Sequence, residues 1–497
     1  MNPSINFDNS FARLPEVFYA LQEPTPVAKP ELIRLNEKLA ILLGIDEEWL
    51  SSAQGVKVLA GNSVPDGAEP LSAAYAGHQF GGWNPQLGDG RAVLLGEVVG
   101  SDGQRYDIQL KGAGRTPWSR GGDGRSPLGP VLREYIVSEA MFALQVPTSR
   151  SLAAVLSGEQ VYREEVLPGA VLCRVASSHI RFGTFQYFAA RKDIDSLEQL
   201  TKHVIDRHYP SAGDSDNPAL ALLQAVIDRQ VTLVAKWQLL GFIHGVMNTD
   251  NMLVSGETID YGPCAFLDEY QADKVFSSID TGGRYAYQNQ PGIAHWNLMQ
   301  LAQCLLNLIA KHFDSDDAAV EATQSVLDKF PALYTNEYRR LSSPKFGFDQ
   351  FLEGDEELIK DWFELLGRHK LDFTLSFRRL YELAVPSIDP NNSVAHVFDF
   401  PESMSAWLQR WQTRFGLESN ADDRAQQMRC SNPAIIARNH LIEKAITQAN
   451  EDNSLVLFNE LFTALETPFE YRRNNVPDRL LSPPLAPEVV HRTYCGT

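Results

Sequence analysis

Residues 244–262, HGVMNTDNMLVSGETIDYG, combine a histidine, an asparagine and an aspartate at set spacings, with apolar residues between them. Asn251 follows His244 by seven positions, and Asp260 follows in the segment IDYG. We expect the second half of this stretch to form a short hairpin that brings Asn251 and Asp260 close together. Because amide and carboxylate oxygens suit a divalent cation, the pattern predicts a metal site at these two residues.

The spacing is typical of the catalytic loop of kinase-type phosphotransferases, except at one position. In such loops an aspartate two residues after the histidine accepts the hydroxyl proton, and an asparagine and a later aspartate hold metal. Here Val246 stands at that position, and a valine cannot accept a proton. Three interpretations stay open: a catalytically inactive relative of kinases, a kinase with a substitute base, or an enzyme that uses the same fold for a different chemistry. Asp250 is the carboxylate inside the loop that could act as the base.

The composition indicates a folded protein with more than one lobe. The chain has 497 residues, of which 44% are hydrophobic and 22% charged. A formal net charge of −19 disfavours nucleic acid and anionic membrane as partners. We see no apolar run near the ~18 residues that span a bilayer, and no signal or transit pattern at the start. We therefore expect a cytoplasmic protein that does not bind membranes.

The cysteines are scattered along the chain and form no CxxC pair or metal-ligand spacing. A disulfide framework or a zinc site therefore has little support. The five positions are Cys173, Cys264, Cys304, Cys430 and Cys495.

The order of patterns predicts an α+β protein with a protein-kinase-like bilobal fold. Residues 1–70 are expected to form an N-terminal extension with short helical pieces, as in residues 29–45, packed on the kinase-like core. Residues 71–178 form a small β-rich N-lobe with one key helix, and residues 179–390 form a large helical C-lobe that carries the catalytic loop. Residues 391–497 form a C-terminal helical extension and a Pro-rich tail.

Alternation and turn signals predict the elements inside these parts. In the small lobe we expect strands at 91–100, 105–112, 151–158 and 169–177, and a helix at 130–146. In the remainder we expect helices at 217–242, 292–313, 401–415 and 432–450.

Three basic positions and one acidic position favour a phosphate-binding site. Lys111 ends a predicted strand and Glu134 lies early in the next helix, which is the pair that kinases use to fix an ammonium on phosphates. Arg174 and Arg181 could close on the same phosphate chain. Alone, such charges are more often solvated surface groups, but the loop at 244–262 makes a nucleotide site the better interpretation.

Glycines beside arginines give a weaker indication of the same site. Gly88, Gly90 and Arg91 lie in QLGDGRAV, and Gly124 lies in RGGDGRSPLG. Glycine lets backbone amides approach phosphate oxygens closely. Neither stretch matches GxGxxG or GxxxxGK[ST], so each alone is as consistent with a tight turn.

Long motifs add a resemblance to a known family. The segments YAGHQFGGWNPQLGDGRA, QLKGAGRTPWSRGGDGRSPLG, RVASSHIRFGTF, HGVMNTDNM and IDYGPCAF resemble SelO, the selenoprotein O or YdiU-like family of kinase-fold protein adenylyltransferases. The resemblance implies a nucleotide bound in a flipped orientation, so that AMP passes to a Ser, Thr or Tyr hydroxyl and pyrophosphate leaves. On this interpretation Val246 is no obstacle, because the base stands elsewhere.

The resemblance also assigns roles to single residues. Asp250 is similar to the proton acceptor of the family, and Asn251 and Asp260 are similar to its ligands for Mg²⁺ or Mn²⁺. It further implies UMP transfer from UTP, transfer to the chain itself, and a link to oxidative stress. The nucleotide-binding set that it implies is Gly88, Gly90, Arg91, Lys111, Asp123, Gly124, Arg174, Arg181 and Asp260, with Glu134 as the ion-pair partner of the lysine.

Cys495 stands where eukaryotic members of the family carry selenocysteine, which suggests a redox role. A tail thiol can form a disulfide, and Cys264 beside the DYG turn is one candidate partner. A free thiol without function is an equally good interpretation, and the sequence contains no geometry that chooses between them.

Overall fold

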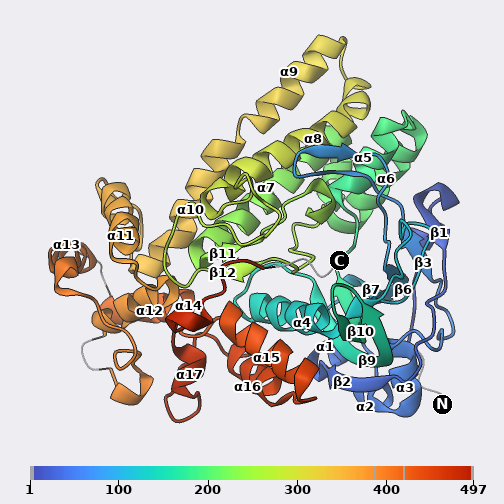
Figure 1. Cartoon of the computed structure of the whole chain (residues 1–497). Coiled ribbons are helices and arrows are strands. Elements are labelled where there is room, and N and C mark those ends of the chain that lie inside the picture. Colours follow the sequence, from blue (N-terminus) through green and yellow to red (C-terminus); the bar gives the residue numbers. More distant parts are fainter. Residues whose placement is uncertain (1–4, 386–387, 418–419, 494–497) are drawn as a thin grey trace.

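A computed structural model describes residues 5–385, 388–417 and 420–493 as a mixed α+β protein, so the predicted fold class is confirmed at that level (Figure 1). Its main sheet is antiparallel, with strand order β1-β3-β6-β7-β10-β9-β2 and β8 paired to β10. The strands are β1 (Tyr19–Leu21), β2 (Glu31–Leu35), β3 (Leu71–Ala73), β6 (Ala92–Val99), β7 (Arg105–Lys111), β8 (Ser126–Pro127), β9 (Arg150–Tyr162) and β10 (Val166–Ala176).

The centre of the sheet follows the predicted strands. β6 and β7 form the expected hairpin, with Ala92 opposite Lys111, and β9 and β10 pair next to it. Gly103 adopts φ +77° in the turn between β6 and β7, a conformation that glycine accepts without strain. Two further strand pairs lie outside the sheet: β4 (Gly77–Gln79) with β5 (Gly82–Asn84), and β11 (Phe242–Ile243) with β12 (Ala265–Phe266).

Both edges of the sheet come from the N-terminal segment. β1 pairs with β3 at one edge and β2 pairs with β9 at the other. The prediction of helical pieces was therefore wrong for residues 31–35. These residues form β2, which pairs with β9 through backbone hydrogen bonds and ends before α1 (Glu37–Leu42) begins. Asn36 caps α1 by accepting a hydrogen bond from the amide of Leu39, so the helix starts where its capping residue stands.

The helix α4 (Leu128–Ala143) is buried on nearly all sides. One side packs on β9 and β10, and α15 (Asn439–Glu451) and α16 (Val456–Leu465) of the C-terminal segment pack on it as well (Figure 1). Arg133 of α4 donates to Asn439 Oδ1 at 3.1 Å and pairs with Glu443. The helix that carries Glu134 is therefore held between the sheet and residues more than 300 positions later in the chain.

The rest of the chain is mainly helical. Its helices are α2 (Glu47–Ser51), α3 (Ala53–Leu59), α5 (Phe182–Ala190), α6 (Ile194–His208), α7 (Pro218–Leu240), α8 (Gln290–Ala310), α9 (Asp316–Leu327), α10 (Phe330–Phe346), α11 (Asp355–His369), α12 (Phe373–Ala384), α13 (Ser405–Phe415), α14 (Ala421–Ser431) and α17 (Asp478–Leu481). Among the described residues one helix, α7, is long and apolar enough to cross a membrane, but more than half of its most apolar window is buried and it packs on α8 and α10, as a core helix does.

One predicted helix begins later than expected. The prediction placed a helix over 432–450, but α15 starts at Asn439 and the residues before it are not helical and are largely buried. Arg438, the residue before the helix, pairs through its buried guanidinium with Asp268 at 2.5 Å and Asp372 at 2.8 Å. These long-range ion pairs fix the position of Arg438, and no local helical pattern reports them.

Candidate functional site

The centre of the candidate site is a buried ion cluster around Asp260. Lys111 Nζ and Arg174 Nη1 each lie 2.8 Å from Asp260 Oδ1, and Arg181 Nη1 lies 2.8 Å from Oδ2. Lys111 comes from the end of β7 and Arg174 from β10, while Arg181 is the N-cap of α5. Asp260 itself adopts φ +62°, a backbone conformation that non-glycine residues reach mostly at special sites.

Glu134 of α4 is the second carboxylate of the cluster. Its oxygens lie 2.5 Å from Lys111 Nζ and 3.0 Å from Arg174 Nη1, so the predicted Lys111–Glu134 pair is present. The cluster thus holds three cationic side chains and two carboxylates, and the cationic side chains are nearly excluded from solvent. An excess of positive charge in a buried place fits a polyanionic ligand.

The charges of the cluster keep both carboxylates ionised. Burial raises the pKa of Asp260, but the charges of Lys111, Arg174 and Arg181 outweigh burial and leave that pKa well below its usual value. The pKa of Glu134 is lowered in the same way, since Lys111 and Arg174 outweigh the effect of burial. Both carboxylates are therefore negatively charged at neutral pH.

The loop that carries Asp260 is organised by His244. His244 Nε2 lies 2.9 Å from the carbonyl oxygen of Ile259, and Nδ1 accepts a hydrogen bond from the amide of Val246 at 3.3 Å. Burial lowers the pKa of His244, so the ring is neutral and donates with one nitrogen while it accepts with the other. The histidine therefore connects the start of the loop to the residue just before Asp260.

The hairpin predicted for the second half of this loop was wrong. Leu253 forms an antiparallel bridge with Arg181, and Thr258 forms a parallel bridge with Thr148, so each arm pairs with another part of the protein. Both residues are buried, and their backbone groups find partners across the core and not in the neighbouring arm. β11 and β12 close the base of the loop instead.

Asp250 lies beside the cluster on a short 3₁₀ turn, Thr249–Asn251. Arg181, which binds Asp260, also donates to the backbone oxygen of Asp250. The Asp250 side chain is 7% exposed, and its Oδ2 accepts a hydrogen bond from Gln79 Nε2 at 3.0 Å. Burial raises the pKa of Asp250 to about 6, although the hydrogen bond from Gln79 and the charge of Arg181 act in the opposite direction. This carboxylate can exchange a proton near neutral pH.

The two predicted metal ligands offer a hard, oxygen-based donor set. Asn251 Nδ2 donates to the carbonyl of Val246 at 3.0 Å, which leaves the amide oxygen as its ligand atom. Within the described ranges no three His, Cys, Asp or Glu side chains gather as a metal site. One carboxylate and one amide fit Mg²⁺, which commonly takes few protein ligands and completes its shell with phosphate and water. Both oxygens of Asp260 are bound by cations, so a metal would compete with them.

The first glycine-rich stretch, which contains Gly88 and Gly90, lies beside the end of β7. The carbonyl of Arg91 accepts from the amide of Gly112 at 2.7 Å, so residues 88–91 run next to the residue that follows Lys111. Gly88 and Gly90 pack so tightly on Trp118 that an added Cβ would lie 2.4 Å and 2.8 Å from it.

Asp123 and Gly124 make other contacts. Asp123 pairs with Arg163 at 2.9 Å, and a Cβ at Gly124 would lie 2.0 Å from the carbonyl of Gly114. Only glycine, which has no Cβ, fits at these close backbone contacts. In the part of the chain that is described, the hydrogen bonds of the Asp123 carboxylate go to Arg163 and to the Arg125 amide, and none goes to the ion cluster.

Several neighbours of the cluster were not predicted. Gln109 Oε1 accepts from Arg174 at 2.6 Å, and Gln109 Nε2 donates to buried Asp89 at 3.3 Å. The guanidinium of Arg181 lies over the ring of Tyr75, 4.9 Å from its centroid. Gln109 alternates with Lys111 on β7, a signal that places both on one face of the strand. Tyr75 offered no comparable local signal.

The described cysteines Cys173, Cys264 and Cys304 are buried thiols, and Cys430 is exposed. Cys495 lies outside the described residues, so the redox role suggested for it is untested, as is the alternative of a free thiol. Thr493, two positions earlier, donates from Oγ1 to the carbonyl of Pro263 at 2.6 Å. The described end of the tail therefore reaches the residue before Cys264.

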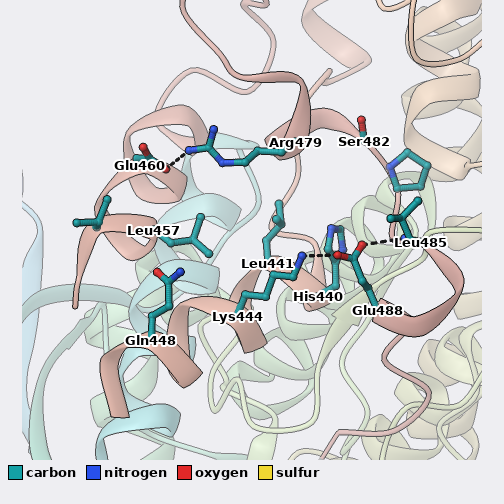
Figure 2. Close-up of a pocket in the computed structure, with 12 residues that line it drawn as sticks. His440, Leu441, Lys444, Gln448, Leu457, Glu460, Arg479, Ser482, Leu485 and Glu488 are labelled. Carbon is teal, nitrogen blue, oxygen red and sulfur yellow. Dashed lines mark hydrogen bonds and ion pairs between the residues drawn. The ribbon is translucent and has the colours of Figure 1, made fainter. Parts of the chain in front are cut away.

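A cavity of about 520 Å³ lies away from this cluster, between α15, α16 and the segment after α17 (Figure 2). Its wall is largely apolar, and Figure 2 shows two ion pairs across it, Lys444 with Glu488 and Arg479 with Glu460. These four charges neutralise one another. The cavity therefore lacks the unbalanced charge of the cluster around Asp260.

Comparisons with known proteins identify the family of this chain. The family model described as protein adenylyltransferase SelO matches residues 2–466. Relatives described as protein nucleotidyltransferase YdiU are 54% identical in Rhizobium etli over 99% of this chain and 97% of the relative, and 54% identical in Bradyrhizobium sp. over 99% of both. A third, from Agrobacterium fabrum, is 53% identical over 99% of this chain and 100% of the relative. The chain therefore belongs to the SelO family of protein adenylyltransferases and is an enzyme of the protein nucleotidyltransferase class.

Proposed function

We propose that this enzyme transfers AMP from ATP to Ser, Thr or Tyr hydroxyls of proteins, itself included, and releases pyrophosphate. The observation that carries the proposal is the excess of positive charge in the buried cluster, where Lys111, Arg174 and Arg181 face two carboxylates. Attack at the α-phosphate leaves negative charge on pyrophosphate. Fixed cations that are shielded from water stabilise that charge far better than solvent does.

Asp250 is the proposed proton acceptor. As the acceptor oxygen bonds to the α-phosphorus, the bond from that phosphorus to the bridging oxygen breaks, and the hydroxyl proton passes to the Asp250 carboxylate. Its pKa of about 6 keeps it mainly ionised at neutral pH and still basic enough to take the proton. A flipped nucleotide, with the α-phosphate towards Asp250, agrees with the absence of a carboxylate at Val246.

Nucleotide binding would rearrange the partners of Asp260. Lys111, Arg174 and Arg181 would exchange the Asp260 carboxylate for phosphate oxygens, which frees that carboxylate for a metal. Asn251 and Asp260 would hold Mg²⁺ or Mn²⁺, which when bound neutralises phosphate charge. Gly88, Gly90, Arg91, Asp123 and Gly124 are proposed to complete the nucleotide site.

Four finer points are also proposals, drawn from the sequence patterns or from the family. The first is that the sheet with α4 and the helical part after it form a protein-kinase-like pair of lobes. The second is that UTP serves as an alternative donor for UMP transfer. The third is the link to oxidative stress, and the fourth is a cytoplasmic location.

The test is a parallel incubation of the full chain with Mg²⁺ and ATP labelled at the α- or the γ-phosphate, with itself and a bacterial lysate as acceptors. We expect α-label on protein, an AMP mass increment, and loss of both in Asp260→Asn. Label from the γ position alone would make the enzyme a kinase with an unexpected base. ATP binding without any label would indicate a silent scaffold.

A further inference from the structure

The hairpin of β4 and β5 lies directly on the turn that carries Asp250. Three successive residues of the hairpin bond this turn: the His78 amide donates to Thr249 Oγ1 at 2.7 Å, Gln79 Nε2 donates to Asp250 Oδ2 at 3.0 Å, and the Phe80 amide donates to Asn248 Oδ1 at 3.0 Å. Residues 78–80 are about 170 positions away from their partners in the sequence. The orientation of the Asp250 carboxylate therefore depends on a distant hairpin.

The tip of this hairpin has an unusual backbone conformation. Phe80 adopts φ +51° and Gly81 φ +84°, and a bulky residue at positive φ is strained. The Phe80 ring lies 5.1 Å from that of Tyr285, whose hydroxyl donates to Asn248 Oδ1 at 2.7 Å. The contacts with Asn248 and Tyr285 thus hold Phe80 in this conformation. The side chain of the preceding residue, Gln79, points to Asp250.

The two oxygens of Asp250 have different surroundings. Oδ2 accepts the hydrogen bond from Gln79, whereas Oδ1 is buried and has no hydrogen-bond partner among the described residues. Gly77 lies next to Oδ1, where an added Cβ would stand only 2.9 Å away. A buried carboxylate oxygen without a partner is costly unless a ligand completes it. Because Gly77 has no Cβ, the hairpin packs close to Oδ1 without pressing on it.

We propose that Gln79 is a positioning residue that fixes Asp250 through Oδ2, so that Oδ1 is the atom that receives the acceptor proton. This inference rests on the proposed AMP transfer and specifies its geometry. The proton moves from the acceptor hydroxyl to Oδ1 while the oxygen–phosphorus bond forms and pyrophosphate leaves. Gln79 touches neither the nucleotide nor the acceptor, and it acts by holding the base in one orientation.

Two nearly isosteric replacements of Gln79 separate positioning from packing. Gln79→Met keeps the length and removes the donor, and Gln79→Glu keeps the shape but places an acceptor against Asp250. We expect kcat for transfer of α-label to fall about ten- to a hundredfold in the Met variant, and further in the Glu variant, as for other partners that orient a reactive group. KM for ATP should stay within about twofold, because the nucleotide cluster is untouched.

A purely structural role predicts a different result. If Gln79 only filled space, Glu would be tolerated at least as well as Met, and KM would change together with kcat. Gln54→Met is the matched control, since Gln54 donates to Ser63 on the surface and the variant should keep the wild-type kcat. Gly77→Ala tests the space at Oδ1 independently, and we expect a lower kcat with an unchanged KM for ATP.

The outcomes distinguish this inference from the function on which it rests. Wild-type protein that transfers AMP, together with Gln79→Met at wild-type kcat, would overturn the role of Gln79 alone. Absence of AMP transfer by the wild type would overturn the proposed function and this role with it. The predicted order of kcat, wild type above Met above Glu at constant KM, would support both.

Discussion

Strand β7 contributes residues to two buried ion clusters that differ in their charge balance. Asp107, Gln109 and Lys111 alternate along it, so they point to one face of the strand. At one end Lys111 joins the cationic cluster around Asp260. At the other end Asp107 lies 2.5 Å from Arg207 and 3.0 Å from His179 Nδ1.

The second cluster is balanced in charge. Arg207 also lies 3.0 Å from Glu97, which pairs with Arg105 at 3.4 Å, and burial lowers the pKa of His179 so that its ring is neutral. Two guanidiniums thus meet two buried carboxylates, and Arg105 also pairs with half-exposed Asp8 at 2.6 Å, so no positive charge is in excess. This cluster attaches α6 to the sheet, whereas in the cluster around Asp260 three cationic side chains contact two carboxylates. Both clusters are buried, so it is their charge balance that separates the candidate site from a structural ion network.

The largest effect is expected at Asp260. Asp260→Asn should lower transfer of α-label by about 10³-fold or more, because the cations lose their anchor and the metal loses its carboxylate ligand. Label transfer measured with folded protein checks this. The counterpart is Asp107→Asn in the balanced cluster, which should lower Tm but keep transfer in the folded fraction. Equal loss of transfer in both variants would contradict the distinction.

Breaking the balanced cluster should cost stability. Arg207→Met leaves Glu97 and Asp107 without their shared guanidinium, and such a change to buried pairs costs about 3 kcal/mol or more. Urea unfolding measures this as a lower midpoint. ATP affinity of the folded variant should remain near that of the wild type, and a large drop in affinity would show that the two clusters are coupled.

Lys111→Met should weaken ATP binding. It removes one charge-assisted contact to phosphate, for which we expect a rise in Kd of about 10–100-fold. Titration calorimetry checks this. Lys38→Met is a suitable control, because the Lys38–Glu466 pair lies on the surface and its loss should leave Kd unchanged. An unchanged Kd in Lys111→Met would argue against a nucleotide at the cationic cluster.

The smallest effect concerns acid stability near the balanced cluster. Burial, and then the charge of Arg207, lower the pKa of His203 to about 4. The unfolded chain therefore takes up this proton first as pH falls below about 6.5, and stability is lost between about pH 6.5 and 4. His203→Phe should reduce the loss between pH 7 and 5 by on the order of 2 kcal/mol or less, as measured by urea unfolding. The same slope in the variant would exclude His203 as its source.

Prediction from the sequence succeeded where structure depends on near neighbours. The β6–β7 hairpin, strands β9 and β10, and the Lys111–Glu134 pair follow from alternation and from one strand and helix in succession. It failed for residues 31–35 and for the hairpin expected after Asn251. Those backbones pair with partners far along the chain, which no local pattern reports.

By itself, the sequence determined the α+β class, the family motifs and most of the side chains of the candidate site. Only the tertiary structure decided how these side chains combine. It placed both carboxylates among three cations, and it set Gln79 against one oxygen of Asp250 and Gly77 beside the other. The physical reason is that hydrophobic periodicity and turn chemistry act over a few residues, whereas the charge balance and hydrogen bonding around Asp260 and Asp250 depend on contacts between segments 79 to 171 positions apart.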